Sequence, residues 1–135
     1  ADAPMGWSLH LADGRLGFTW SHASSSLDAV APDRLSAGEW HLVAVTVRRG
    51  SPDGGKLYVD GALVHTFDTT PLAGAVDTDA LLHVALQPAL GRGQPARGFV
   101  GAIDEVELFD RPISGDDIRA IYAADRFGKC DKPRR

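Results

Sequence analysis

The segment from Gly98 to Tyr122 constrains the fold of this chain more than any other part, because it combines three local signals in a fixed order. Its first part, Val100 to Phe109, has the apolar and polar pattern of a strand. Asp110-Arg111-Pro112 follows as a turn, since proline fixes its own φ and has no N–H for a sheet ladder. The segment therefore predicts a closing strand, a turn and, directly after them, a short helix.

The expected helix, at about 115–124, begins with a capping pattern. Ser114 can accept a hydrogen bond from the backbone N–H three residues later, and Asp117 stands where a capping-box acid reaches back. Asp116 and Asp117 also favour the positive end of the helix dipole. Apolar residues then recur at helical spacing, which predicts one packed face: Ile118, Ile121 and Tyr122.

The rest of the chain alternates short apolar runs with turn residues. Strands are expected at Trp7–Leu11, Leu16–Trp20, Trp40–Val47, Leu57–Val59, Leu63–Phe67 and Leu81–Leu86. Asp13-Gly14 and Asp60-Gly61 are hairpin turns between neighbouring runs, whereas Ser21–Ser26 and Pro88–Gly98 are expected to be loops. Many strands at short spacing with almost no helix predict an all-β fold, an antiparallel sandwich of two sheets.

The apolar positions that are in phase within these segments predict the core. They are Val43, Val45, Leu57, Val59, Val106, Leu108, Ile118 and Tyr122. Trp7 is in phase with the leucines of its run, Trp20 is in phase with Phe18, and Trp40 opens a strand, so all three indoles are expected to pack. A less favoured interpretation makes any one of Trp7, Trp20 and Trp40 a platform on which a sugar stacks, with Trp7 and Trp20 as weak candidates for ligand binding.

Bulk properties exclude several classes of function. A length of 135 residues indicates one domain, and 44% apolar with 24% charged residues is ordinary for a folded protein. The net charge of −4, without a basic stripe, gives nucleic-acid binding little support. No run of apolar residues reaches membrane-spanning length, and no signal peptide is present in this sequence.

Cys130 is the single cysteine of the sequence, and three interpretations are open. It is an inert thiol near a chain end, or a half-cystine whose partner lies outside this sequence. A catalytic nucleophile is the least favoured, because the surrounding tail is polar and has no nearby histidine.

Three blocks of the sequence resemble laminin G-like domains of the concanavalin A-like lectin/glucanase and pentraxin-like group. The blocks are Phe99–Tyr122, with the order F-x-G-x-I-D-E-V followed by D-R-x-I-S, Gly38–Thr46, with G-x-W-H-x-V-A-V-T, and Lys56–Val64, with L-Y-V-D-G. The resemblance implies a jelly-roll sandwich. It implies a domain at 1–128 that lacks its first strands, and a C-terminal tail at 129–135.

The resemblance also implies a function. It implies a non-catalytic binding or adhesion module that recognises a glycan or protein partner, within a larger extracellular or cell-surface protein. The alternative is a structural subunit that packs edge to edge in a complex. Family members open with two or more strands before the hairpin at Trp7. Other parts of a larger chain, or a neighbouring subunit, are therefore expected to complete the sheet edge.

An acidic cluster in the closing strand raises the question of catalysis. Glu105 and Glu107 would share one strand face at about 7 Å, which is close to a glycosidase carboxylate pair. The run also resembles the E-x-D-x-x-E strand of family 16 glycoside hydrolases. Ala102, however, stands where that motif needs its nucleophilic glutamate, so no enzyme is expected. Glu105 and Glu107 remain weak candidates for ligand binding.

Calcium is the ion that the resemblance implies, with Asp104 as the first candidate ligand and Asp77 and Asp79 behind it. Asp104 would share a side with core residues, where an unpaired carboxylate is costly, so it needs a metal or hydrogen-bond donors. The loop Leu86–Arg97 holds two arginines and no acid, so the double-calcium phosphocholine site of pentraxins is not expected.

Overall fold

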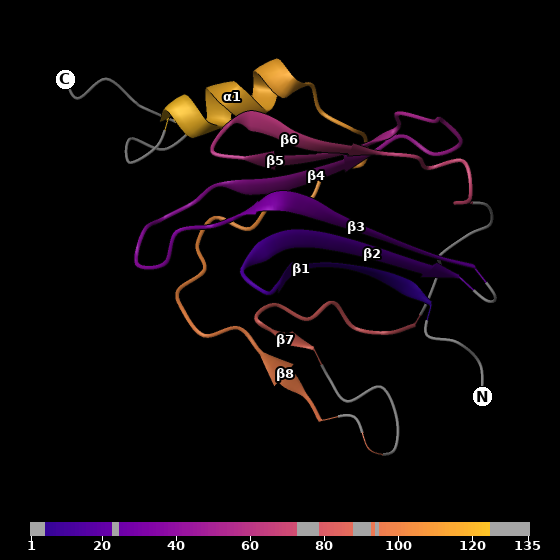
Figure 1. Cartoon of the computed structure of the whole chain (residues 1–135), viewed down its shortest axis with the longest axis horizontal. Coiled ribbons are helices and arrows are strands. Elements are labelled where there is room, and N and C mark those ends of the chain that lie inside the picture. The colour runs from indigo at the N-terminus through magenta and orange to yellow at the C-terminus, as the bar shows by residue number, and fades with distance from the viewer. Residues whose placement is uncertain (1–4, 23–24, 73–78, 88–92, 94, 125–135) are drawn as a thin grey trace.

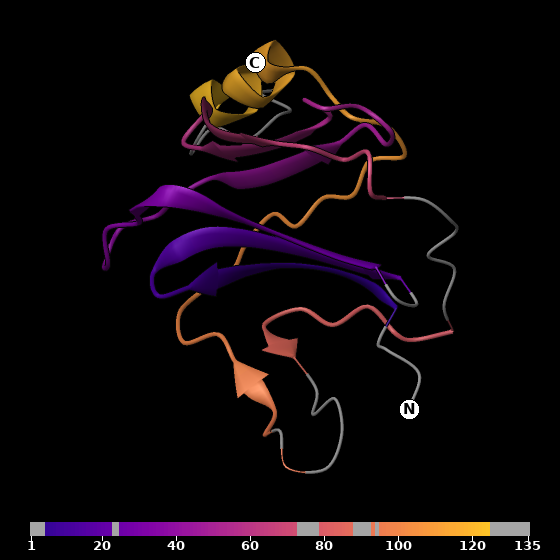
Figure 2. The ribbon, with the colours of Figure 1, turned by 45° about the vertical axis from the view of Figure 1, so that its right-hand side comes forward.

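Two antiparallel sheets of three strands each form two layers in this computed structural model, which describes residues 5–22, 25–72, 79–87, 93 and 95–124 (Figure 1). One sheet has the order β1 (Gly6–Ala12), β2 (Arg15–His22), β3 (Ser25–Arg34), and the other has β4 (Val43–Val47), β5 (Gly55–Val59), β6 (Ala62–Phe67). A short ribbon pairs β7 (Leu86–Gln87) with β8 (Arg97–Gly98), and the helix is α1 (Gly115–Ala124). Figure 2 shows the same layers turned, with α1 outside the second sheet and the β7–β8 ribbon beyond β1. The antiparallel sandwich with one short helix is thus confirmed.

Both Asp-Gly hairpins form as expected. Asp13 and Gly14 have φ of 51° and 73°, and Asp60 and Gly61 have φ of 51° and 80°. Two successive positive φ angles are the mark of a type I′ turn, whose twist matches that of the strands it joins. The turns therefore fix the β1–β2 and β5–β6 registers, in which Ala12 pairs with Arg15 and Val59 with Ala62.

The core lies between the inner faces of the two sheets. Its buried members are Leu16, Phe18, Trp20, Ala29, Ala31, Leu57, Phe67 and Leu72. The rings of Phe18 and Phe67, one from each sheet, stack with 5.7 Å between their centroids. Val43, Val45 and Val59 are partly buried against this cluster, so the predicted core positions on β4 and β5 are confirmed.

The helix also forms as predicted, with one exception in its packing. The Ser114 Oγ accepts from the Asp117 N–H at 3.0 Å, and an Asp117 carboxylate oxygen accepts from the Ser114 N–H at 3.1 Å. Ile118 is buried, but Tyr122 is 45% exposed, so its assignment to the core was wrong. The Tyr122 ring lies against Gly61 in the β5–β6 turn. The sheet ends at this turn, so it covers only one side of the ring.

β3 has no counterpart among the strands expected from the sequence. The residues Ser25–Ser26 were expected in a loop, yet they open a strand of ten residues. The strand alternates as strands do, with Leu27, Ala29 and Ala31 facing the core. The signal was weak because alanine and serine have low strand propensity and Pro32 normally marks a break. Pairing with β2 decided the outcome.

The closing strand expected at Val100–Phe109 does not form. None of the residues 100–109 is in a strand, and Val106 and Leu108 are 56% and 63% exposed rather than buried. Glu105 has a φ of 51°, which interrupts an extended backbone. An alternating pattern makes a strand only where a neighbouring strand pairs with it, and within the described residues none does.

Further expectations about core positions and strand bounds need correction. Trp7 is 44% exposed on β1 and Trp40 is 70% exposed before β4, so neither is a core residue. Of the strand expected at Leu81–Leu86, only Leu86 is in a strand. The expected strand at Trp40–Val47 begins only at Val43. The domain boundary expected at residue 128 and Cys130 lie outside the described residues.

A pair of leucines tests this division between core and surface. Leu57→Ala should lower the free energy of unfolding by about 2–5 kcal/mol, because Leu57 is fully buried and its loss leaves a cavity. Leu108→Ala, the same chemical change at an exposed position, should cost less than about 0.5 kcal/mol. Urea denaturation followed by circular dichroism measures both. A loss of several kcal/mol in Leu108→Ala would mean that residue 108 is packed after all.

Candidate functional site

The acidic residues of the expected closing strand, Asp104, Glu105 and Glu107, lie on the exposed segment 101–110. Because this segment is not a strand, the argument that Glu105 and Glu107 share one face at a fixed spacing no longer applies. One Asp104 oxygen accepts from the Glu105 N–H at 2.8 Å, a local turn contact. Asp104 is exposed, so burial does not require it to have a metal partner.

Calcium binding stays a prediction. Across the described ranges, no three histidine, cysteine, aspartate or glutamate side chains gather closely enough to hold a metal ion. Asp79 is exposed and Asp77 lies outside the described residues. Of the two weak aromatic candidates, Trp7 is half-exposed, whereas Trp20 is buried in the core beneath the Arg49 guanidinium, which lies 5.2 Å from the centre of its ring.

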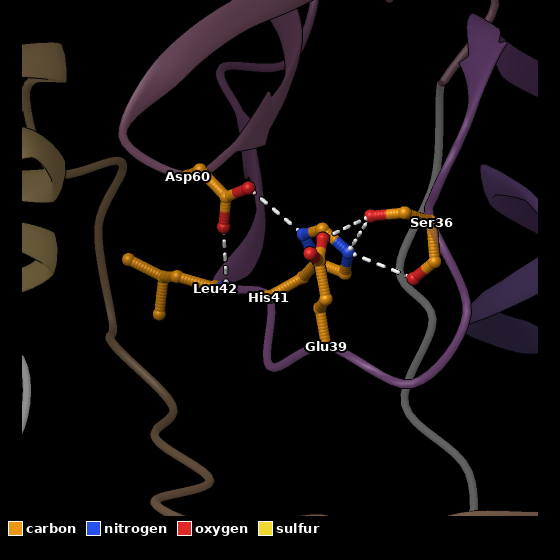
Figure 3. Close-up of polar contacts among 5 residues, drawn as sticks. All are labelled: Ser36, Glu39, His41, Leu42 and Asp60. Carbon is orange, nitrogen blue, oxygen red and sulfur yellow. Dashed lines mark hydrogen bonds and ion pairs between the residues drawn. The ribbon is translucent and has the colours of Figure 1, made fainter.

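A polar cluster at the end of the second sheet was not anticipated as a unit. It joins Ser36, Glu39 and His41, on the segment between β3 and β4, to Asp60 in the β5–β6 turn (Figure 3). His41 and Asp60 stand in two of the sequence blocks quoted above, but they are separated by 18 intervening residues, and no local pattern pairs them. The fold brings them together.

Asp60 is the hub of this cluster. One carboxylate oxygen accepts from the Leu42 N–H at 3.0 Å, and the other lies 2.8 Å from the His41 Nδ1. The Asp60 N–H donates to the Leu42 carbonyl at 2.8 Å. Asp60 tolerates the positive φ of the turn, as a short polar side chain can, and its side chain is free to reach the neighbouring segment. The turn residue is therefore also the anchor of the chain that enters β4.

The surroundings of His41 favour its charged form. The Nδ1 faces the Asp60 carboxylate, and the Nε2 lies 3.0 Å from the Ser36 carbonyl oxygen, which can only accept. Both ring nitrogens must donate to satisfy these two acceptors, and only the imidazolium can do so. The hydrogen bond to Asp60, more than any other contact, therefore raises the pKa of His41, against the opposing effect of burial.

The order Ser36–His41–Asp60 looks like a hydrolytic triad, but the hydrogen atoms are in the wrong places. A triad histidine accepts the serine proton on its Nε2. Here the Ser36 hydroxyl donates its proton to Glu39 at 2.5 Å, so its oxygen, 3.1 Å from the Nε2, has no proton to give to the ring, and the Nε2 also faces the Ser36 carbonyl oxygen at 3.0 Å. The cluster therefore fixes the position of a loop and does not activate a nucleophile. The loop that it fixes presents the exposed Trp40.

This chain is similar to a family model, to one curated protein sequence and to one solved structure. A model of the laminin G family, described as the concanavalin A-like lectin/glucanases superfamily, matches residues 1–119. The basement membrane-specific heparan sulfate proteoglycan core protein of Mus musculus is 31% identical over 104 residues, which are 75% of this chain and 3% of that protein. An S-layer domain-containing protein of Clostridium thermocellum matches with a TM-score of 0.45 and 23% identity, over 82% of this chain and 52% of that chain.

This chain thus spans a small fraction of the proteoglycan and about half of the S-layer chain. Among the described residues, no helix is long and apolar enough to cross a bilayer.

The cluster predicts a pH-dependent contribution to stability. Because folding raises the pKa of His41, its contribution is complete below the unfolded pKa of about 6.5 and is lost as pH rises through the higher folded pKa. His41→Gln should therefore lower the free energy of unfolding more at about pH 6 than at about pH 9. Denaturant titrations at both pH values measure the difference.

The matched control is His83→Gln, because His83 is exposed and has no hydrogen-bond partner within the described ranges. An equal loss for His41→Gln at both pH values would show that the imidazolium contact with Asp60 is absent in solution.

Proposed function

This chain belongs to the laminin G family of the concanavalin A-like superfamily, and we propose on that basis that it recognises a protein partner within an extracellular or cell-surface protein. Domains of this family are non-catalytic binding modules, and this chain is one of them rather than an enzyme. The observation that supports a protein partner is the apolar surface of the segments 81–86 and 99–109.

This apolar surface consists of large side chains that a folded domain normally covers. They are Leu81, Leu82, Val84, Leu86, Phe99, Val100, Ile103, Val106, Leu108 and Phe109, each 44% exposed or more. The β7–β8 pairing, with the Phe99 N–H donating to the Ala85 carbonyl at 2.9 Å, holds the two segments together. Exposed apolar surface on this scale marks a place where another polypeptide binds.

The backbone of the same region supports strand addition. The outer edge of β1 pairs with no strand among the described residues, so the N–H and C=O groups on that edge have no ladder partner there, and none of the residues 100–109 is in a strand. A strand from another part of a longer chain, or from a neighbouring subunit, would satisfy these groups and cover the apolar side chains together. An assembly role, with edge-to-edge packing, uses the same surface.

Self-association tests the proposal, with a second copy of the chain as the probe. The wild type should form concentration-dependent oligomers in size-exclusion chromatography with light scattering, and it should bind a dye that reports exposed apolar surface. The double variant Val106→Asn/Leu108→Asn should reduce both signals. Leu63→Asn, at an exposed apolar position on β6, is the control that should not. A monomer that binds no dye at any concentration would contradict the proposal.

Glycan recognition is the second candidate, and Trp40 supports it. An exposed indole on a loop fixed by hydrogen bonds can stack on a sugar ring, and Ser36 and Glu39 lie on the same loop. A glycan array should then show ligands whose binding falls about three- to tenfold in Trp40→Ala. Trp7→Ala, a second half-exposed indole, is the matched comparison. An array with no bound glycan would eliminate this candidate.

A further inference from the structure

A polar pocket of about 300 Å³ lies on the outer face of the second sheet, and its lining shares no residue with the apolar surface or with the His41 cluster. Its floor comes from β4 and β5, and its walls come from the loop between these strands and from the segment that leads into α1. The lining residues are Thr46, Arg48, Asp53, Gly54, Lys56, Tyr58, Pro112, Ile113, Ser114 and Gly115. This volume suits one small chemical group.

The floor of the pocket carries two hydroxyl groups, those of Thr46 and Tyr58. Thr46 lies opposite Lys56 across the β4–β5 ladder, and Tyr58 is two residues further along the same face of β5. Thr46 is 8% exposed and Tyr58 is 5% exposed, and both line the pocket. Neither side-chain oxygen has a hydrogen-bond partner among the described residues. Neither oxygen is fully enclosed by protein, so both hydroxyls can bond to a group that enters the pocket.

The charge at the rim is positive. Arg48 and Lys56 form no ion pair with any carboxylate in the part of the chain that the structure describes. Asp53 is the one lining acid, and the Ser51 hydroxyl donates to it at 2.7 Å, which lowers the pKa of its carboxyl. Two cations against one carboxylate make this a positive site on a chain whose net charge is −4.

The start of α1 adds backbone donors. The Gly115 and Asp116 N–H groups, in the first turn, have no acceptor among the described residues, and the helix dipole favours an anion there. Both acids of this turn already have partners, since an Asp117 carboxylate oxygen accepts from the Ser114 N–H at 3.1 Å and Asp116 pairs with Arg119 at 2.9 Å. A Cβ on Gly115 would lie 3.5 Å from the Tyr58 hydroxyl, so the backbone passes close to the floor.

The loop that forms the other wall is held in place. Thr69 is fully buried, and its hydroxyl lies within hydrogen-bond distance of the Arg48 and Ser51 carbonyls and accepts from the Ser51 N–H at 3.1 Å. The Arg48 N–H donates to the Gly54 carbonyl at 2.8 Å. The backbone at Arg48 is therefore set before any ligand arrives, which reduces the backbone entropy lost on binding.

We propose that this pocket binds a small oxyanion group, a sulfate, phosphate or carboxylate, which the Arg48 and Lys56 side chains and the Thr46 and Tyr58 hydroxyls would hold. The site is separate from the surface proposed above for a protein partner and does not depend on it. The oxyanion arrives either free or as a substituent of an acidic saccharide, since both present the same oxygens.

Titrations followed by NMR, at constant ionic strength with chloride as the balancing ion, test the proposal. The probes are sodium sulfate, sodium phosphate and a sulfated disaccharide. Saturable shifts are expected at residues 46–58 and 113–116, with about tenfold weaker binding in Lys56→Gln, because a hydrogen bond to a charged group is lost. Tighter binding of the disaccharide would identify a saccharide ligand, and equal binding would identify a free ion; either result supports an oxyanion site.

Two further variants separate binding from folding. Tyr58→Phe keeps the ring and removes only the hydroxyl without a partner, so it should weaken binding while the free energy of unfolding stays the same. Arg34→Gln makes the same charge change at an exposed arginine that pairs with Asp13, and it should bind as the wild type does. Absence of saturable binding for all three probes would overturn the proposal. So would equal weakening in Lys56→Gln and Arg34→Gln, because that would show only general charge attraction.

Discussion

The structure depends on the contact between the inner faces of the two three-stranded sheets. The stacked rings of Phe18 and Phe67 join the layers, and Leu57 is completely enclosed beside them. This contact demands a glycine at residue 55, because a Cβ there would lie 2.1 Å from the Phe67 ring. Each sheet has one apolar face to bury, and burying the two against each other is the main source of stability in a sandwich of this size.

Because the second sheet buries one face against the first, its other face is available for different chemistry. Ile118 of α1 is buried, and Thr46, Lys56 and Tyr58 line the polar pocket on that outer face. At the end of the same sheet, Asp60 holds the loop that presents Trp40. Three regions with separate chemistry thus surround one small core: an apolar surface, a hydrogen-bonded loop and a positive pocket. Such a division suits a module that binds by its surface and performs no reaction.

The segment 99–109 shows the limit of local reasoning. Its sequence has the strand pattern and matches the laminin G family closely, and the family assignment is confirmed. Its side chains are nevertheless exposed, because hydrogen-bond partners for its backbone must come from a distant strand. The same reasoning explains β3, where weak strand formers are extended because β2 pairs with them.

The sequence by itself determined the features that depend on a few neighbouring residues. Asp13-Gly14 and Asp60-Gly61 form type I′ turns because only such residues accept two positive φ angles, and Ser114 with Asp117 caps α1. Tertiary structure alone decided which residues from distant segments meet. The imidazolium contact of His41 with Asp60, and the convergence of Arg48, Tyr58 and Gly115 around one pocket, follow from how sheets and helix pack. Turn and cap preferences act over about four residues, whereas side chains that come from separate elements meet only once the core has fixed those elements in space.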